Sequence, residues 1–227
     1  TVTLPDGAIL AVASGGDINV ASGGEIDIAS GATLDVNGTI DVTGATVTGL
    51  TTGSLVKLLS TTISGAVAAI AFNSTYVTAT YSKYMLTWEG MTPSTDGHSL
   101  AIALSVDNGV SFPTHVGAFV YNQINGSASF GINGNLAYYP ANTDIDDSAA
   151  AGGASGYAYI YNTTSTSQNK YITGMGAHTN VTVANSYGFS SYGKVSTTSA
   201  INYIKLYEPE AAGNFSAGKA TLYGVET

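Results

Sequence analysis

A short phrase recurs every eight residues near the start of the chain. Each unit carries two branched apolar residues separated by one position, and a glycine-containing corner precedes the pair, as in Ser14-Gly15-Gly16-Asp17-Ile18-Asn19-Val20. Alternation of period two predicts short strands, and the glycines predict turns between them. A further pair, Ile40 and Val42, arrives after a shorter spacing, and the pattern then stops. The repeat therefore predicts a rod of strands and corners over residues 1–49.

This repeat is too short to bury a core within one chain, since solenoid folds need about three or more complete units. If three identical chains each supply one side of a triangular cross-section, every apolar pair faces a shared axis and few strand edges stay free. We therefore expect an intertwined trimeric β-helix or β-prism stalk. Its predicted core consists of Leu10, Val12, Ile18, Val20, Ile26, Ile28, Leu34, Val36, Ile40 and Val42. The alternative is a disordered Gly/Ser-rich linker, against which the strict spacing argues.

The composition excludes several classes of protein. Charged residues make up 9% of the chain, cysteine is absent, and the cations are six lysines without any arginine. We expect no nucleic-acid binding, because phosphate contacts need clustered cations. No apolar run reaches the length of a transmembrane helix, so we expect no membrane insertion. The chain begins at Thr1 without a signal-like segment, which predicts a fragment or a processed product whose missing N-terminal part would carry any attachment function.

The composition changes near residue 50. Residues 1–49 contain six acidic residues and neither lysine nor aromatic residues, whereas every aromatic side chain lies in the remainder. We expect a linker over 50–54 and a head domain over 55–227. Ten apolar-alternating runs predict strands at 75–81, 84–88, 99–106, 110–112, 117–121, 157–161, 171–175, 180–183, 201–207 and 220–225. So many short strands predict a β-sandwich, most plausibly a jelly roll.

Two segments between these runs carry turn signals. Asp107-Asn108-Gly109 predicts a tight hairpin into residues 110–112, since Asn-Gly supplies positive φ. The run of alanine, glycine and serine at 149–156 predicts a mobile loop.

Several of these segments resemble the head domain of tailed-bacteriophage fibre proteins. The resemblance rests on a strand followed by Thr92-Pro93-Ser94, the hairpin Ser105-Val106-Asp107-Asn108-Gly109, and a closing strand with Leu222-Tyr223-Gly224. It covers about a third of the head. It implies an extracellular virion appendage on tail or capsid, which would join other virion proteins through the missing N-terminal part, and it assigns no binding residues.

Candidate binding residues come from composition rather than from a motif. All fifteen tyrosines lie in the head, and tyrosine rings can stack on sugar rings. We expect the ligand-binding tyrosines to be those in predicted loops, namely Tyr138, Tyr139, Tyr187 and Tyr192, while most others pack. Asp144, Asp146 and Asp147 could hold a Ca²⁺ ion, although an Asp-rich surface turn explains the cluster more simply. In the repeat, Asn19, Asp27, Asp35 and Asp41 would project outward as an acidic ladder, which we expect to be solvated. We expect no other cofactor.

The remaining reactive residue types suggest structural roles. His98, His115 and His178 follow no metal-ligand spacing and are expected in loops or on the surface, and Trp88 is expected in the core. No nucleophile or metalloprotease motif is present, so we expect no enzyme. The sequence thus predicts a homotrimeric phage fibre that attaches to a host-surface glycan or protein. The alternatives are a capsid fibre or decoration protein without a receptor, a polysaccharide depolymerase, and a bacterial adhesin tip.

Overall fold

The computed structural model describes residues 55–123, 128–135, 138–148, 152–180, 186–210 and 213–226, with the backbone alone for 123, 128–135 and 138–144. The chain divides into two units, Thr1–Leu50 and Thr51–Thr227, and the described residues all belong to the second. The predicted trimeric stalk, its core from Leu10 to Val42 and the linker at 50–54 lie outside the described residues.

The second unit is built from antiparallel strands in two sheets, which confirms the prediction of an all-β fold. The larger sheet has eight strands in the order β1-β12-β3-β8-β9-β10-β5-β6. Their bounds are β1 Leu55–Ile63, β12 Phe215–Val225, β3 Lys83–Pro93, β8 Ala154–Tyr161, β9 Lys170–Thr179, β10 Ser186–Val195, β5 His115–Gln123 and β6 Ala128–Asn135. No helix in the described part is long and apolar enough to cross a membrane.

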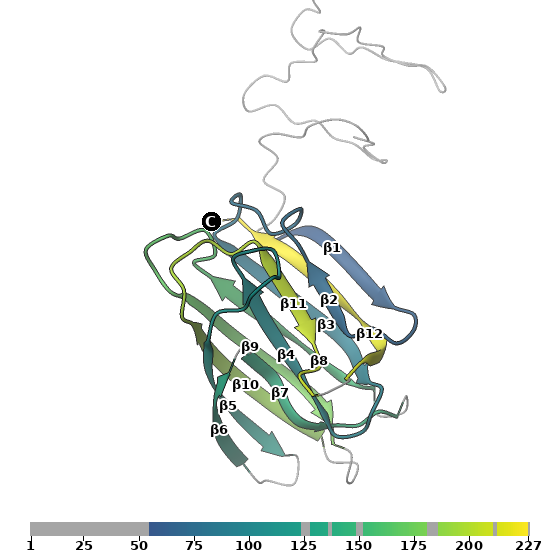
Figure 1. Ribbon diagram of the computed structural model, residues 1–227. Coiled ribbons are helices and arrows are strands. Elements are labelled where there is room, and N and C mark those ends of the chain that lie inside the picture. Colours follow the sequence, from purple (N-terminus) through teal and green to yellow (C-terminus); the bar gives the residue numbers. More distant parts are fainter. Residues whose placement is uncertain are drawn as a thin grey trace, which may run out of the picture. The chain divides into compact units, whose positions relative to one another are not determined.

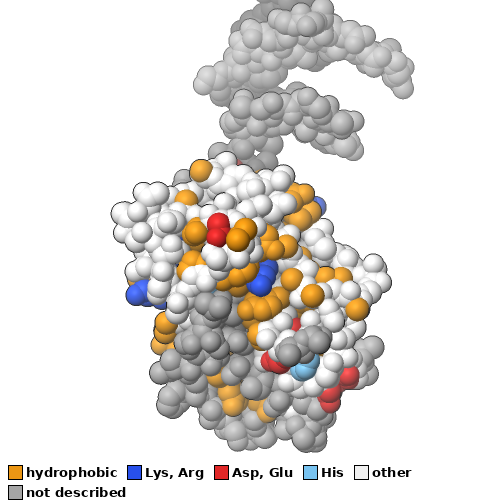
Figure 2. Space-filling model, viewed as in Figure 1, with side chains coloured by type: hydrophobic (Ala, Val, Ile, Leu, Met, Phe, Trp, Pro, Cys, Tyr) orange, Lys and Arg blue, Asp and Glu red, His pale blue; other side chains and the backbone are white. Residues whose placement is uncertain are grey.

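The smaller sheet has four strands in the order β2-β11-β4-β7, and it lies in front of the larger sheet in Figure 1. Its strands are β2 Ala69–Phe72, β11 Tyr203–Tyr207, β4 His98–Ser105 and β7 Tyr138–Ile145. The space-filling view shows this side of the molecule, with apolar side chains scattered among polar ones (Figure 2). The jelly-roll topology expected from the sequence stays a prediction.

The core fills the space between the two sheets. Along β3, the buried side chains of Tyr84, Leu86 and Trp88 alternate with more exposed neighbours, as expected for a strand with one face against a core. The smaller sheet contributes fully buried side chains such as Leu104 and Ile204. Trp88 is 1% exposed, which confirms its predicted place in the core.

Two facing glycines let these strands approach the aromatic core closely. Gly156 of β8 pairs with Gly176 of β9. A Cβ at Gly156 would lie 2.8 Å from the Trp88 ring, and a Cβ at Gly176 would collide with the Phe189 ring. Core aromatics, together with the backbone carbonyl oxygens of Met175 and Ser155, therefore occupy the space that side chains would take at these two positions.

Two sequence-predicted strands are wrong, and one predicted loop is shorter than expected. Residues 75–81 form turns, where Val77 is buried and the Tyr84 hydroxyl donates to the Thr78 carbonyl oxygen at 2.8 Å. Residues 110–112 are not a strand either. The predicted loop at 149–156 overlaps β8, which begins at Ala154. The predicted strand at 180–183 falls mostly outside the described residues.

The Asn108-Gly109 turn exists, but it does not make a hairpin. Asn108 and Gly109 have φ values of 57° and 90°, and the Asp107 carboxylate accepts bonds from Ser105 Oγ at 2.6 Å and from Ser111 N at 2.8 Å. These hydrogen bonds lower the pKa of Asp107 to about 2. After the turn the chain crosses to the larger sheet as β5, while β4 pairs with β11 and β7. Turn chemistry fixed the local bend and left the pairing partner undetermined.

Candidate functional site

The four tyrosines predicted as ligand-binding lie in strands rather than in loops. Tyr138 and Tyr139 begin β7, and their side chains lie outside the described residues. Tyr187 and Tyr192 both belong to β10, but they point to opposite faces because they are an odd number of positions apart. The loop assignment failed because the serines and glycines around these tyrosines look like turn residues, whereas tyrosine itself favours strands.

Tyr187 is part of the packing between strands. Its ring stacks on His178 with centroids 5.3 Å apart and meets the edge of Tyr121 at 5.5 Å. The Asn180 amide also donates to its hydroxyl at 3.3 Å. Tyr192, by contrast, is 63% exposed on the outer face of the larger sheet.

The outer face of the larger sheet carries a continuous group of exposed apolar side chains. The strand registers place them in neighbouring positions on β8, β9, β10 and β5. We call this group the aromatic face. Its exposed members are Tyr157, Tyr171, Met175, Tyr192, Val116 and Val120, and its half-buried members are Tyr159 and Tyr161. Met175 is 53% exposed and Tyr171 48%. Contiguous apolar side chains on a surface can mark a binding site.

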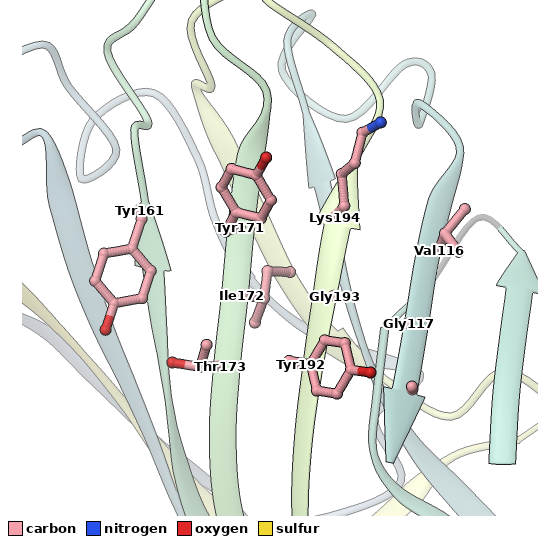
Figure 3. Close-up of a pocket in the computed structure, with 10 residues that line it drawn as sticks. Val116, Gly117, Tyr161, Tyr171, Ile172, Thr173, Tyr192, Gly193 and Lys194 are labelled. Carbon is pink, nitrogen blue, oxygen red and sulfur yellow. The ribbon is translucent and has the colours of Figure 1, made fainter.

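Small neighbours shape the aromatic face into two hollows on either side of Tyr192. Tyr192 stands directly between Thr173 on β9 and Ala118 on β5. A hollow of about 630 Å³ lies toward Tyr161 and Tyr171 (Figure 3), and a second of about 290 Å³ lies toward Tyr157 and Met175. In Figure 3 the rings of Tyr161 and Tyr192 turn their faces to the viewer, who looks down on the sheet. Flat rings beside shallow hollows can receive a flat ligand ring.

The tyrosines of β8 form a ladder in which the rings contact one another and Lys83. Ring centroids are 5.8 Å apart between Tyr157 and Tyr159 and 6.2 Å apart between Tyr159 and Tyr161. The ammonium group of Lys83 lies over the rings of Tyr159 and Tyr161, at 4.4 and 5.0 Å from their centroids. The Tyr157 hydroxyl also lies 3.5 Å from Met175 Sδ. A preorganised set of rings loses less entropy when a ligand binds.

The predicted acidic cluster gains a member that the sequence did not suggest. Asp146 and Asp147 lie with Asp96, such that one carboxylate oxygen from each falls within 4.8 Å of the others. Asp96 accepts a bond from Asp147 N at 3.3 Å, and Ser148 N donates to Asp146 at 2.7 Å. Hydrogen bonds from the Ser148 side chain and from its backbone N–H lower the pKa of Asp146. The side chain of Asp144 lies outside the described residues. Oxygen donors suit Ca²⁺, but exposed turn carboxylates also gather without an ion, so the metal site stays a prediction.

A buried carboxylate cluster at the smaller sheet was also missed by sequence reasoning. The Glu208 side chain is fully buried after β11, and its Oε2 lies 2.8 Å from Nδ1 of His98. Glu210 accepts a bond from Ser99 N at 3.2 Å. Burial raises the pKa of Glu208, against the hydrogen bond from His98 that lowers it. These contacts fasten the end of β11 to the start of β4, which indicates a structural role.

The histidines were expected in loops or on the surface, and the structure places all three in strands. His115 is buried, its Nδ1 donates to the Pro113 carbonyl oxygen at 2.7 Å, and its Nε2 accepts from Leu104 N at 3.2 Å. Burial lowers the pKa of His115 to about 4. The neutral ring therefore accepts a hydrogen bond from the backbone of β4, as a neighbouring strand would.

Comparisons of the chain with protein-family models, with curated proteins and with solved structures gave no match. Function is therefore argued from the geometry of this chain.

Proposed function

We propose that the described domain is a binding head that attaches a virion appendage to carbohydrate on a host-cell surface. The observation that carries the proposal is the aromatic face, where exposed tyrosines on β8, β9 and β10 flank two hollows. The resemblance of residues 84–112 and 201–225 to phage fibre heads supports the virion setting. A jelly-roll head on a trimeric stalk is the architecture that we propose with it.

Stacking is the proposed mode of recognition. One face of a sugar ring presents C–H groups, which contact a tyrosine ring, while the ring hydroxyls stay free to bond to polar groups at the edge. Thr173, Ser190 and the tyrosine hydroxyls are such groups within or beside the hollows. Shallow sites of this kind bind each sugar weakly, so a trimer would gain its useful strength from three linked heads.

We propose binding without hydrolysis. Glycoside hydrolysis uses two carboxyl groups on either side of the scissile bond. Among the eight strands of the larger sheet the one acidic residue is Glu89, and the Glu208 cluster belongs to the smaller sheet. The aromatic face thus has ring surfaces to hold a glycan and lacks a described carboxylate pair to cleave it.

The test is binding of the full chain to a panel of immobilised bacterial and synthetic polysaccharides, followed by polymer length after incubation. We expect saturable binding without shortening of the polymer. The Tyr171→Ala/Tyr192→Ala double variant should lose about tenfold or more in affinity, because it removes two of the three tyrosine rings that line the larger hollow.

The matched control is Tyr207→Ala, which removes a tyrosine from the smaller sheet. It should bind like the wild type, provided that thermal unfolding shows all variants folded. Equal loss in the control and the double variant, or unchanged binding in both, would contradict the proposed site. Shortened polymer would favour a depolymerase instead.

A further inference from the structure

The larger sheet has a charge opposite to that of the whole chain. The chain carries a net charge of −9, with fifteen acidic residues and six lysines. The eight strands of the larger sheet contain Glu89 as their one acidic residue, together with Lys57, Lys83, Lys170, Lys194 and Lys219. Lys170 is buried, and the other four lysines are at least partly exposed. Since salt screens charges beyond about 8 Å at physiological ionic strength, a ligand on this sheet meets mainly the local cations.

Two of these lysines stand at the ends of a row that crosses the aromatic face. The registers place Lys83 opposite Tyr161, Tyr161 opposite Tyr171, and Tyr171 opposite Lys194. Residues directly opposite in paired strands share a face. With about 4.8 Å between strands, the two lysine positions lie roughly 14 Å apart with two tyrosines between them. Figure 3 shows three of the four residues in this row, namely Tyr161, Tyr171 and Lys194.

No acidic side chain of the described residues forms an ion pair with either terminal lysine. Within the part of the chain that the structure describes, the ion pairs are His98–Glu208 and Lys219–Glu89. Lys83 lies over tyrosine rings, and Lys194 extends from the rim of the larger hollow. Both ammonium groups therefore keep donors available beside the stacking surface.

We propose that the aromatic face selects an acidic polysaccharide, one whose sugar rings carry carboxylates. A sugar ring would stack on Tyr161 or Tyr171, and the carboxylate on that ring or on the next would accept bonds from Lys83 or Lys194. The inference rests on the proposed function and adds the class of glycan. Its basis is charge complementarity, because a cation stands at each end of the row of rings.

Two other binding partners could contact the tyrosine rings and the lysines of the aromatic face. Single-stranded nucleic acid stacks on aromatic side chains, but it also requires a cationic groove along its backbone, and two lysines on a chain without arginine do not form one. A second copy of the head could cover the apolar surface, but it would also bury Lys83 and Lys194, whose own strands offer Glu89 alone as an acidic partner. The experiment below distinguishes both from a glycan.

The experiment measures binding of the full chain to hyaluronan, polygalacturonate, alginate and polysialic acid, each beside its carboxyl-reduced neutral form. We expect at least one acidic polymer to bind about five- to tenfold more tightly than its neutral form, and the difference to shrink as NaCl is raised. Lys83→Gln/Lys194→Gln should abolish the difference in affinity between the acidic polymer and its neutral form. Lys57→Gln is the matched control, because it removes an exposed lysine from edge strand β1 of the same sheet, and it should keep the preference.

Each outcome separates this inference from the proposed function. Equal binding of acidic and neutral forms would overturn the acidic specificity and leave carbohydrate attachment standing. Absence of binding to every polymer would overturn both. Preferential binding of oligo(dT), or a fall in solution mass of the Tyr171→Ala/Tyr192→Ala variant by light scattering, would overturn the inference in favour of nucleic acid or of a subunit interface.

Discussion

The two faces of the eight-stranded sheet use the same residue types for different purposes. On the inner side, the Lys170 ammonium group is buried and donates to the carbonyl oxygens of Ser165, Gln168 and Thr198, at 2.6, 2.9 and 3.0 Å. On the outer side, Lys194 of the adjacent strand extends into solvent beside Tyr171. The register pairs Lys194 with Tyr171 and the next residue, Val195, with Lys170. A shift of one position along these paired strands thus separates Lys170, which has a structural role, from Lys194, which is available to a ligand.

Aromatic side chains divide in the same way. Trp88 and Tyr84 fill the core, whereas Tyr192 and Tyr171 stand exposed on the opposite side of the same sheet. Residue type alone therefore does not identify a binding residue in this chain. The direction in which the strand presents the side chain decides its role, and substitutions on the two faces should separate stability from binding.

The largest difference is expected between core and surface aromatics. Trp88→Ala should lower the free energy of unfolding by about 3–5 kcal/mol, because it leaves a large cavity between the sheets. Tyr192→Ala should lower it by less than about 1 kcal/mol, since the ring is mostly in water already. Chemical denaturation of both variants measures the two values. Similar losses would mean that Tyr192 packs against something beyond the described residues.

The paired lysines should show the next largest contrast. Lys170→Met should cost about 3 kcal/mol, because three carbonyl oxygens lose their donor. Burial of the Lys170 ammonium group already lowers its pKa. Lys194→Met makes the same chemical change on the outer face and should alter the unfolding free energy by about 0.5 kcal/mol or less. The same denaturation experiment compares them, and a reversed order would refute the assignment of the two faces.

The buried His115 predicts a dependence of stability on pH. The unfolded chain takes up a proton near the ordinary pKa of 6.5, whereas burial holds the pKa of folded His115 at about 4. The free energy of unfolding should therefore fall as the pH falls from about 6.5 to 4, by up to about 3 kcal/mol from this group. Unfolding of the wild type and of His115→Gln across this interval tests it, since the variant should lose that part of the slope. Identical slopes would contradict a neutral, buried ring.

Two glycines give the smallest contrast between the faces. Gly176→Ala adds a Cβ against the Phe189 ring on the inner side and should cost about 2 kcal/mol by overpacking. Gly188→Ala adds the same group on β10, where a Cβ would meet no atom within 4 Å, and should change stability by less than about 0.5 kcal/mol. Thermal melts of the two variants measure the difference. Equal melting temperatures would show that the core yields at this point.

Strand prediction succeeded where hydrophobic alternation was strong and failed where apolar residues serve turns. The runs at 84–88 and 157–161 became parts of β3 and β8, because aromatic residues or leucine recur there at every second position. The run at 171–175 became part of β9. Residues 75–81 show a similar alternation, yet they form turns that bury Val77. Strands such as β6 and β10, rich in glycine, serine and asparagine, gave too little apolar signal to be found.

The candidate site was predicted only in part. The choice of tyrosine as the stacking residue followed from composition, and Tyr192 was chosen because it was expected in a loop, whereas it lies in β10. Tyr157, Tyr159 and Tyr161 were missed, because tyrosines that alternate along a predicted strand were expected to pack. Alternation shows that side chains share a face, and it does not show whether another layer covers that face.

The sequence by itself determined the all-β class, the core position of Trp88 and the sharp bend at Asn108-Gly109, because these depend on residue properties and local backbone geometry. Only the tertiary structure decided which strands pair, since pairing joins segments far apart in the chain. It also decided that the tyrosines of β8 and β9 stay uncovered while Trp88 does not. The physical reason is that burial depends on what packs against a face, and the smaller sheet covers one side of the larger sheet and leaves the described aromatic face open.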